Sequence, residues 1–294
     1  MPVSVCICAY NEQENIGKLL QSLVNQKTSQ VRIEEIVVVS ASTDATNEIV
    51  EQFQEKDPRI KLIIQGERRG KAHAINLFLQ HSKGEICVLE SADTLPAEET
   101  IERLCKPFSD PSVGMTGGRV IPLNDKSKFM GFVVHLLWEL HHRLQKFGEL
   151  VAFRRIFSNI PENTAVDEAW IQAEVTQRGF KTQYVPDAVV YNKGPETISD
   201  FIKQRRRIYA GHLHLARAKG FKVPSLLPHS VLRTFISNFR FTGMEKIWVL
   251  GAIVLEGLAR LLGLYDFFIR RKVPYVWDVA ITTKLLLSDE RDRC

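Results

Sequence analysis

The sequence has no glycine-rich loop near its N-terminus, no low-complexity segment and no internal repeat. Its five cysteines are an odd number and lack the spacing of a zinc site or a disulfide framework. No signal peptide precedes the first apolar run, so we expect a reducing, cytoplasmic compartment. The missing glycine-rich loop argues against a nucleotidyltransferase, which would use such a loop to hold phosphates.

Strong charge of one sign is also missing. The chain has 294 residues, a formal net charge of +5, 45% apolar residues and 25% charged residues. This composition is that of an ordinary soluble domain, and the length is enough for one large core with an appendage. The mild basic excess suits nucleoside diphosphates or a phospholipid surface, and it gives no indication of nucleic-acid binding.

Four apolar runs, each followed by a polar turn, predict a parallel sheet covered by helices. They begin near residues 3, 33, 60 and 85, and helical patterns follow. Ligands of open α/β sheets bind at the carboxyl ends of the strands. The turns after the runs are therefore the expected binding site.

These turns and the later segments carry an ordered set of motifs. They are Ala9-Tyr10-Asn11-Glu12, Ser42-Thr43-Asp44-Ala45-Thr46, Gly70-Lys71-Ala72, Ser91-Ala92-Asp93, Asp167-Glu168, residues 179–186 and Gln204-Arg205-Arg206-Arg207. The set resembles family 2 glycosyltransferases of the GT-A fold over about residues 1–212.

The resemblance implies an α/β, GT-A fold, in which a mostly parallel sheet is flanked by helices. A glycosyltransferase domain would cover residues 1–212, and a C-terminal helical region would cover residues 213–294. The implied activity is inverting transfer of a sugar from a UDP- or GDP-linked donor to an acceptor hydroxyl. The implied acceptor is a glycan or a lipid-linked molecule.

The resemblance also assigns a donor site with two departures. The family uses an Asp-x-Asp element for a divalent cation, Mg²⁺ or Mn²⁺, which neutralises the leaving diphosphate. This chain has Ser91 at the first position, so Asp93 is the expected metal ligand and weaker metal affinity is expected. Ser40 stands near the position of a base-binding aspartate. The remaining expected donor-binding residues are Ala9, Tyr10, Glu12, Lys71, Ser91, Gln204, Arg205 and Arg207.

Each of these assignments has a structural alternative. Asp93 is also suited to capping a turn, and Lys71 to a solvated loop position. For the arginine run of residues 205–207, the less favoured alternative is a basic surface face.

Inversion needs a general base that takes the proton of the attacking hydroxyl. In the family this base lies eleven residues before the glycine that ends its helix, which here gives Glu168 when counted back from Gly179. Asp167 is the second candidate. An acidic first turn that complements the helix dipole is the structural alternative for both.

The apolar helix expected over residues 129–144 places His135, Glu139 and His142 on one face. A metal site there is conceivable. A histidine-rich acceptor face, or plain packing, is the favoured interpretation.

Residues 247–269 are apolar but interrupted by three charged residues. The longest uncharged run, residues 247–255, is too short to span a bilayer, so the sequence predicts an amphipathic helix. Two placements stay open. The helix lies in a membrane interface, with residues 270–272 on anionic headgroups, or it packs on the catalytic domain. A lipid-linked acceptor would favour the first and place the protein at the inner face of the membrane.

A second functional hypothesis is a non-catalytic, nucleotide-binding relative that acts as a scaffold, because Ser40 and Ser91 replace two expected aspartates. Asp93, Glu168 and the arginine run favour the enzyme.

Overall fold

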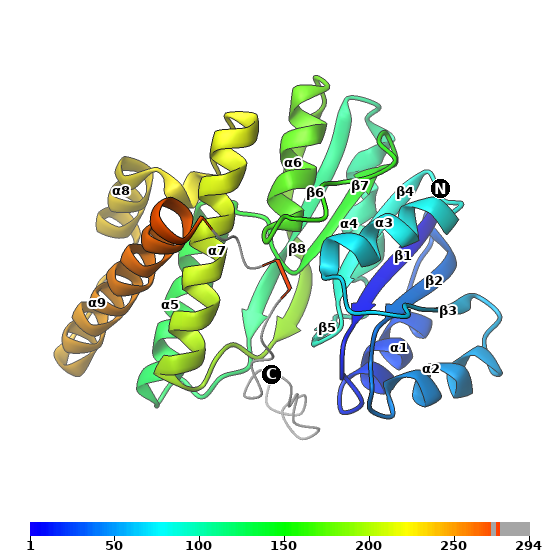
Figure 1. The fold of residues 1–294 in the computed structure, drawn as a ribbon, viewed down its shortest axis with the longest axis horizontal. Coiled ribbons are helices and arrows are strands. Elements are labelled where there is room, and N and C mark those ends of the chain that lie inside the picture. The colour runs from blue at the N-terminus through cyan, green and yellow to red at the C-terminus, as the bar shows by residue number, and fades with distance from the viewer. Residues whose placement is uncertain (272–274, 277–294) are drawn as a thin grey trace.

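The computed structural model describes residues 1–271, 275 and 276. These residues form one mixed sheet of eight strands in the order β3-β2-β1-β4-β7-β6-β8-β5, with helices packed against it (Figure 1). The strands are β1 (Pro2–Ala9), β2 (Arg32–Ser40), β3 (Ile60–Ile64), β4 (Ile86–Ser91), β5 (Thr94–Pro96), β6 (Val113–Pro122), β7 (Leu150–Arg154) and β8 (Lys181–Asn192). The α-helices are α1 (Ile16–Val24), α2 (Thr46–Gln54), α3 (Lys71–His81), α4 (Thr100–Cys105), α5 (Phe129–Arg143), α6 (Asp167–Gln177), α7 (Ile198–Lys219), α8 (Pro228–Asn238) and α9 (Gly243–Tyr265).

The first four strands form the parallel half that the sequence predicts. β1 pairs in parallel with β2 and with β4, and β2 pairs in parallel with β3. Successive residues of β1 enter opposite core layers: Val5 and Ile7 pack in the layer of α1, whereas Cys6 packs in the layer of α3. Burial on both faces explains why these strands read as nearly continuous apolar runs.

The second half of the sheet mixes strand directions. β7 is antiparallel to both β4 and β6, while β6 and β8 are parallel. Because β7 runs against β4, the residue before β7 lies beside the end of β4. The backbone N–H of Ser91 accordingly donates to the carbonyl of Glu149 at 3.2 Å. This pairing brings a later segment of the chain to the edge where ligands of the parallel half bind.

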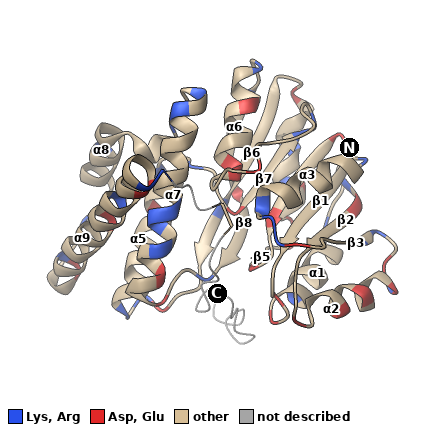
Figure 2. Ribbon diagram, in the orientation of Figure 1, with Lys and Arg blue, Asp and Glu red and all other residues tan. Residues whose placement is uncertain are grey.

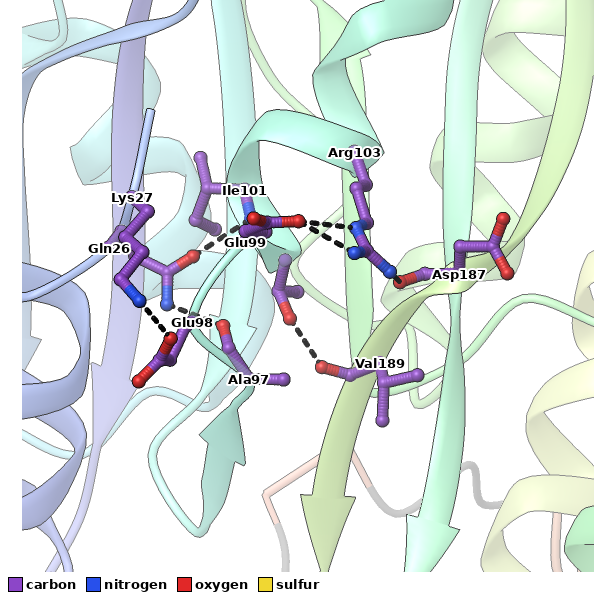
Figure 3. Close-up of polar contacts among 10 residues, drawn as sticks. Gln26, Lys27, Ala97, Glu98, Glu99, Ile101, Arg103, Asp187 and Val189 are labelled. Atoms are coloured by element: carbon purple, nitrogen blue, oxygen red, sulfur yellow. Dashed lines mark hydrogen bonds and ion pairs between the residues drawn. The ribbon is translucent and has the colours of Figure 1, made fainter. Parts of the chain in front are cut away.

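The connection after β5 is held from both sides (Figure 3). Gln26, just after α1, donates through Nε2 to the carbonyl of Ala97 at 2.7 Å and accepts from the N–H of Ile101 at 3.0 Å. On the other side, Arg103 donates to the carbonyl of Asp187 in β8 at 3.3 Å. These contacts position the short turn, residues 92–93, between β4 and β5.

α6 begins at Asp167, so both predicted base candidates lie in its first turn. Negative charge there is favourable because the N-terminus of a helix carries partial positive charge. Gly179, two residues after the helix, has a φ of +85°, a conformation that glycine adopts at little cost.

α7 is longer than the sequence pattern indicates, and the expected domain boundary after residue 212 falls inside it. α9 packs along α7 (Figure 1). The charged residues that interrupt the apolar stretch face α7: Arg205 donates to Glu256 at 2.8 and 2.9 Å, and Arg206 pairs with Asp266. The charged side of α9 is therefore packed on the catalytic domain, which realises the second of the two open placements.

α9 and a short π-helical continuation (Asp266–Arg270) form one 28-residue helix. By length and composition this helix is long and apolar enough to cross a membrane. Its apolar sequence is interrupted by Glu256, Arg260 and Asp266, which is the amphipathic pattern that the sequence predicts. The outward side of this helix carries many large apolar residues. Lys272, the last of the three basic residues expected after it, lies outside the described residues. The exposed apolar residues of α9 include Met244, Ile247, Leu250, Ile253, Val254, Leu258 and Leu261.

We predict that Glu256→Gln destabilises the fold strongly. The Arg205 side chain is 9% exposed, so losing its counter-charge leaves a buried cation, at a cost of about 3–5 kcal/mol. Urea denaturation measures this free energy of unfolding. The control is Glu99→Gln, which breaks an exposed pair with Arg103 and should cost less than about 1 kcal/mol.

The loss of unfolding free energy in Glu256→Gln should also depend on pH. Burial alone would raise the pKa of Glu256, but Arg205 and Arg260 lower it to about 2. Since the unfolded value is about 4.3, the stabilisation is present above that pH and is lost as pH falls toward the folded value. The difference between the wild type and Glu256→Gln should shrink between about pH 5 and 3. An equal difference at both pH values would contradict this assignment.

Candidate active site

A cavity of about 1700 Å³ opens at the carboxyl ends of the parallel strands. It exceeds the roughly 300–1000 Å³ of a typical small-molecule site, so it has room for two substrates. Most of the site residues expected from the sequence line it: Ala9, Tyr10, Glu12, Lys71, Ser91, Asp93, Glu168, Gln204, Arg205 and Arg207. Ser40 and Asp167 are buried and do not contribute to the lining.

The β1 end of the cavity offers a flat stacking surface. The guanidinium carbon of Arg68 lies 3.8 Å from the centroid of the Tyr10 ring. Such a stack presents a planar, positively charged face, which suits the base and ribose of a nucleotide. The neighbouring Glu12 is held in place, because its N–H donates to Thr46 Oγ1 at 2.8 Å. Arg68 was not singled out for this role by the sequence motifs.

Ser40 has no exposed surface in this structure. Its hydroxyl donates to Ser42 Oγ at 2.9 Å and accepts from the N–H of Ser42 at 3.1 Å. The direct neighbours of Ser40 in the chain, Val39 and Ala41, line the cavity instead.

Lys71 is a buried site residue, so the solvated-loop alternative is wrong. Gly70, with a φ of +96°, turns the chain so that α3 begins at Lys71. The Lys71 ammonium donates to Glu168 Oε1 at 2.5 Å, and the two side chains are 12% and 18% exposed. Burial would lower the pKa of Lys71, but Glu168 and Asp167 raise it, so the lysine is charged.

Glu168 is the accessible member of the acidic pair. Burial would raise its pKa, but Lys71 lowers it, so Glu168 is ionised. Asp167 is 1% exposed, and its burial raises its pKa to about 7. Only Glu168 lines the cavity, which agrees with the order of preference from the residue count.

Glu149 is a site residue that the sequence motifs do not reveal. Ser91, which stands in place of the first Asp-x-Asp carboxylate, donates its hydroxyl to Glu149 Oε2 at 2.8 Å. Burial and then the charge of Asp93 raise the pKa of Glu149 to about 7. A carboxyl group from the start of β7 thus lies beside the position where the motif lacks one. Only the antiparallel register of β4 and β7 places it there.

The arginine run of α7 is split between two roles, and Figure 2 shows this basic stretch in blue. Arg205 is engaged with Glu256 of α9. Desolvation lowers the pKa of Arg207 to about 10, and the charges that act on it most strongly are Asp167, Glu149 and Glu168. Arg207 therefore faces the acidic group across the cavity.

On the face of α5 considered for a metal site, His135, Glu139 and His142 each contact a different partner. His135 bonds the carbonyl of Asn124 at 2.8 Å, His142 bonds the Tyr184 hydroxyl at 3.1 Å, and Glu139 pairs with Arg143. No group of three or more potential metal-binding side chains occurs among the residues that the structure describes. His141, which points to the other side of α5, lines the cavity and was missed.

Comparison with known proteins finds relatives of one family and one fold. The family model described as "Glycosyl transferase family 2" matches residues 4–172. Glycosyltransferase AglE of Haloferax volcanii is 34% identical over 118 residues, which is 40% of this chain and 39% of AglE. The match to the next curated relative covers 72% of this chain and 56% of that protein, so the chain spans about two fifths to just over half of their length.

Two solved structures share the fold. The mannosyltransferase PcManGT from Pyrobaculum calidifontis, in complex with GDP-Man and Mn²⁺, has a TM-score of 0.65 and 22% identity, and the match covers 92% of this chain and 88% of that one. Residues 1–349 of TarS from S. aureus, in complex with UDP-GlcNAc, have a TM-score of 0.55 and 19% identity, with 91% and 80% covered.

Proposed function

This chain belongs to glycosyl transferase family 2, and from that premise we propose that it is an inverting glycosyltransferase with a UDP- or GDP-linked sugar donor. The observation that carries the proposal is one cavity that unites a stacking surface, a pair of carboxyl groups and a lysine-bound glutamate. The GT-A neighbours, whose complexes contain GDP-Man and UDP-GlcNAc, support this donor class. A catalytically inactive scaffold would have no use for an ionised Glu168 in the wall of the cavity.

The donor would lie across the ends of β1 and β4. In this arrangement the Tyr10–Arg68 stack meets the base, with Ala9, Glu12 and Ser40 nearby. Arg207 and Gln204 lie on the facing helix, where a guanidinium group suits phosphate oxygens. Ser91 acts through its bond to Glu149, and Arg205 lies farther along α7, against α9.

The residues present fit a divalent cation. Asp93 and Glu149 both line the cavity, and the charge of Asp93 raises the pKa of Glu149, so a cation beside them would favour the ionised form of Glu149. Mg²⁺ is commonly held by one or two carboxylates together with substrate phosphates and water. We propose that Asp93 and Glu149 hold Mg²⁺ or Mn²⁺, which when bound neutralises charge on the leaving diphosphate.

The transfer itself would use Glu168. As the acceptor oxygen attacks the anomeric carbon, Glu168 takes the hydroxyl proton, and the bond from that carbon to the diphosphate breaks with its electron pair leaving on the diphosphate. Attack opposite the leaving group inverts the anomeric configuration. Lys71 keeps Glu168 ionised and oriented before the reaction, and Arg207 stabilises the negative charge of the departing group.

We predict that UDP or GDP with Mn²⁺ stabilises the protein against thermal unfolding. Ligand at 100 times its dissociation constant should add about 2.7 kcal/mol. Asp93→Asn and Glu149→Gln should each reduce the Mn²⁺-dependent part, whereas Asp110→Asn, an exposed carboxylate far from the cavity lining, should not. If no nucleoside diphosphate shifts the transition, the donor site is wrong. If the Mn²⁺-dependent stabilisation is unchanged in both variants, Asp93 and Glu149 are not the metal ligands.

A second prediction separates the two acidic residues of α6. Glu168→Gln should leave donor binding nearly unchanged and reduce the rate of transfer by about 10²–10⁴, the usual contribution of a positioned general base. Asp167→Asn should cost less, because Asp167 does not line the cavity. Steady-state rates with saturating donor make the comparison. A greater loss in Asp167→Asn with binding intact would assign the base to Asp167.

We also propose that α8 and α9 dock on the cytoplasmic face of a membrane without crossing it, near a lipid-linked acceptor. The charged side of α9 is engaged by α7, and its outward side is apolar. On α8, Leu232 and Ile236 are also exposed apolar residues. Arg270, at the end of the π-helical segment after α9, adds an exposed positive charge. Crossing would separate Glu256 and Asp266 from their arginines, which is costly in hydrocarbon.

Co-sedimentation with anionic liposomes tests the docking surface. Leu250→Ser combined with Leu261→Ser should weaken binding, because both side chains are exposed on α9, at 63% and 65%. Ile64→Ser, an equally exposed apolar residue of β3, is the control. Salt should remove only the electrostatic part of the binding. Equal binding of the double variant and the wild type would contradict docking, and resistance to alkaline carbonate would indicate insertion.

A further inference from the structure

Three basic side chains on the α5 side of the cavity have no role in the transfer described above. His141 lies in α5, Lys146 in the connection to β7, and His212 in α7, and all three line the cavity. His141 and His212 are each only 4% exposed. Lys146 and His212 both act electrostatically on His141, so three separate segments bring basic groups close together in the wall of the cavity.

This wall holds basic side chains that the described part of the protein leaves without partners. Among the described residues, Nδ1 of His141 and Nδ1 of His212 have no hydrogen-bond partner, and the Lys146 ammonium forms no ion pair. The carboxylate that acts on Lys146 from α9, Glu256, is already occupied by Arg205 at 2.8 and 2.9 Å and by Arg260 at 2.8 Å.

The electrostatic consequences agree with this geometry. Burial and then the charge of Arg205 lower the pKa of Lys146 to about 7. Burial and then Lys146 lower the pKa of both histidines. A buried polar group without a partner is costly, so an anion that enters this wall would be stabilised by all three side chains.

We infer that His141, Lys146 and His212 form a subsite for a phosphoryl group carried by the acceptor. The inference rests on the proposed glycosyl transfer and names the acceptor class: a molecule with a phosphoryl group and, elsewhere, the hydroxyl that meets Glu168. The same two carboxylates, Glu149 and Glu168, act on both Lys146 and Arg207. Lys146 and Arg207 therefore both lie within electrostatic reach of the same acidic group in the cavity.

The apolar lining indicates how such an acceptor would enter. Leu137 and Trp138 of α5 and Phe267 and Phe268 of the π-helical segment line the same cavity. Phe268 is 60% exposed and continues the apolar surface of α9. The phosphoryl group is thus reachable both from a lipid surface and from solution, and the shared chemistry is a phosphoryl anion.

Titration calorimetry of the full chain tests the subsite, with and without saturating UDP or GDP and Mn²⁺. The probes are farnesyl phosphate, inorganic phosphate and farnesol. We expect farnesyl phosphate or inorganic phosphate to bind with the nucleotide present, and Lys146→Met and His212→Gln each to weaken this binding about tenfold or more, the usual effect of losing a charged hydrogen bond. Lys146→Arg should retain it.

The matched control is Lys203→Met, since Lys203 lines the same cavity but is largely exposed and pairs with Asp200. Unchanged binding of this variant shows that the effect is local. Tighter binding of farnesyl phosphate than of inorganic phosphate indicates a lipid headgroup, and equal binding indicates a soluble phosphorylated acceptor.

Three results would overturn the inference. They are no binding of either phosphate probe, wild-type binding of the probe by both Lys146→Met and His212→Gln, or displacement of the probe by the nucleotide. Nucleotide binding retained in the variants shows that they are folded. If neither UDP nor GDP binds, the proposed donor site fails, while the titration without nucleotide still decides the phosphoryl subsite.

Discussion

The antiparallel pairing of β7 with β4 is the constraint on which the site depends. β4 is hydrogen-bonded on one side to the parallel half and on the other to β7. The start of β7 consequently lies at the end of β4, and Glu149 reaches Ser91. Without this pairing, the turn with Asp93 would stand at the edge of a half-sheet, and no second carboxyl group would lie beside it.

Charged residues are arranged in three zones around the pairing of β4 with β7. The carboxyl groups of Asp93 after β4, Glu149 before β7 and Glu168 in α6 occupy the middle, with Lys71 bound to Glu168. Arg207 faces them from α7, and the basic wall at Lys146 lies on the α5 side. In a partly buried cavity such groups shift one another's protonation, and strongly shifted pKa values cluster at functional sites. The zones match a reaction in which a diphosphate leaves and a proton moves to a carboxylate.

α9 connects this site to the outside of the molecule. Its charged residues bind the same arginine run that contributes Arg207 to the cavity. Its remaining side is apolar and exposed. Because Arg205 and Arg206 are held by α9, the position of Arg207 depends on a helix whose other face is available to lipid. The exposed apolar face of α9 and the cavity are in this way connected through α7.

The sequence by itself determined the parallel half of the sheet, the order of the motifs and the family. β-branched runs, helical periodicity and turn residues are local signals. The sequence placed Lys71 in a turn after Gly70, and in the structure Lys71 is the first residue of α3; Glu168, counted back from Gly179, lies in the first turn of α6. Only the tertiary structure decided which side chains meet. Glu149 is paired through strand register, the charges of α9 face α7 rather than solvent, and His141 rather than His135 lines the cavity. Such contacts join residues far apart in the chain, and their formation depends on the packing of whole elements, which no local pattern of residues encodes.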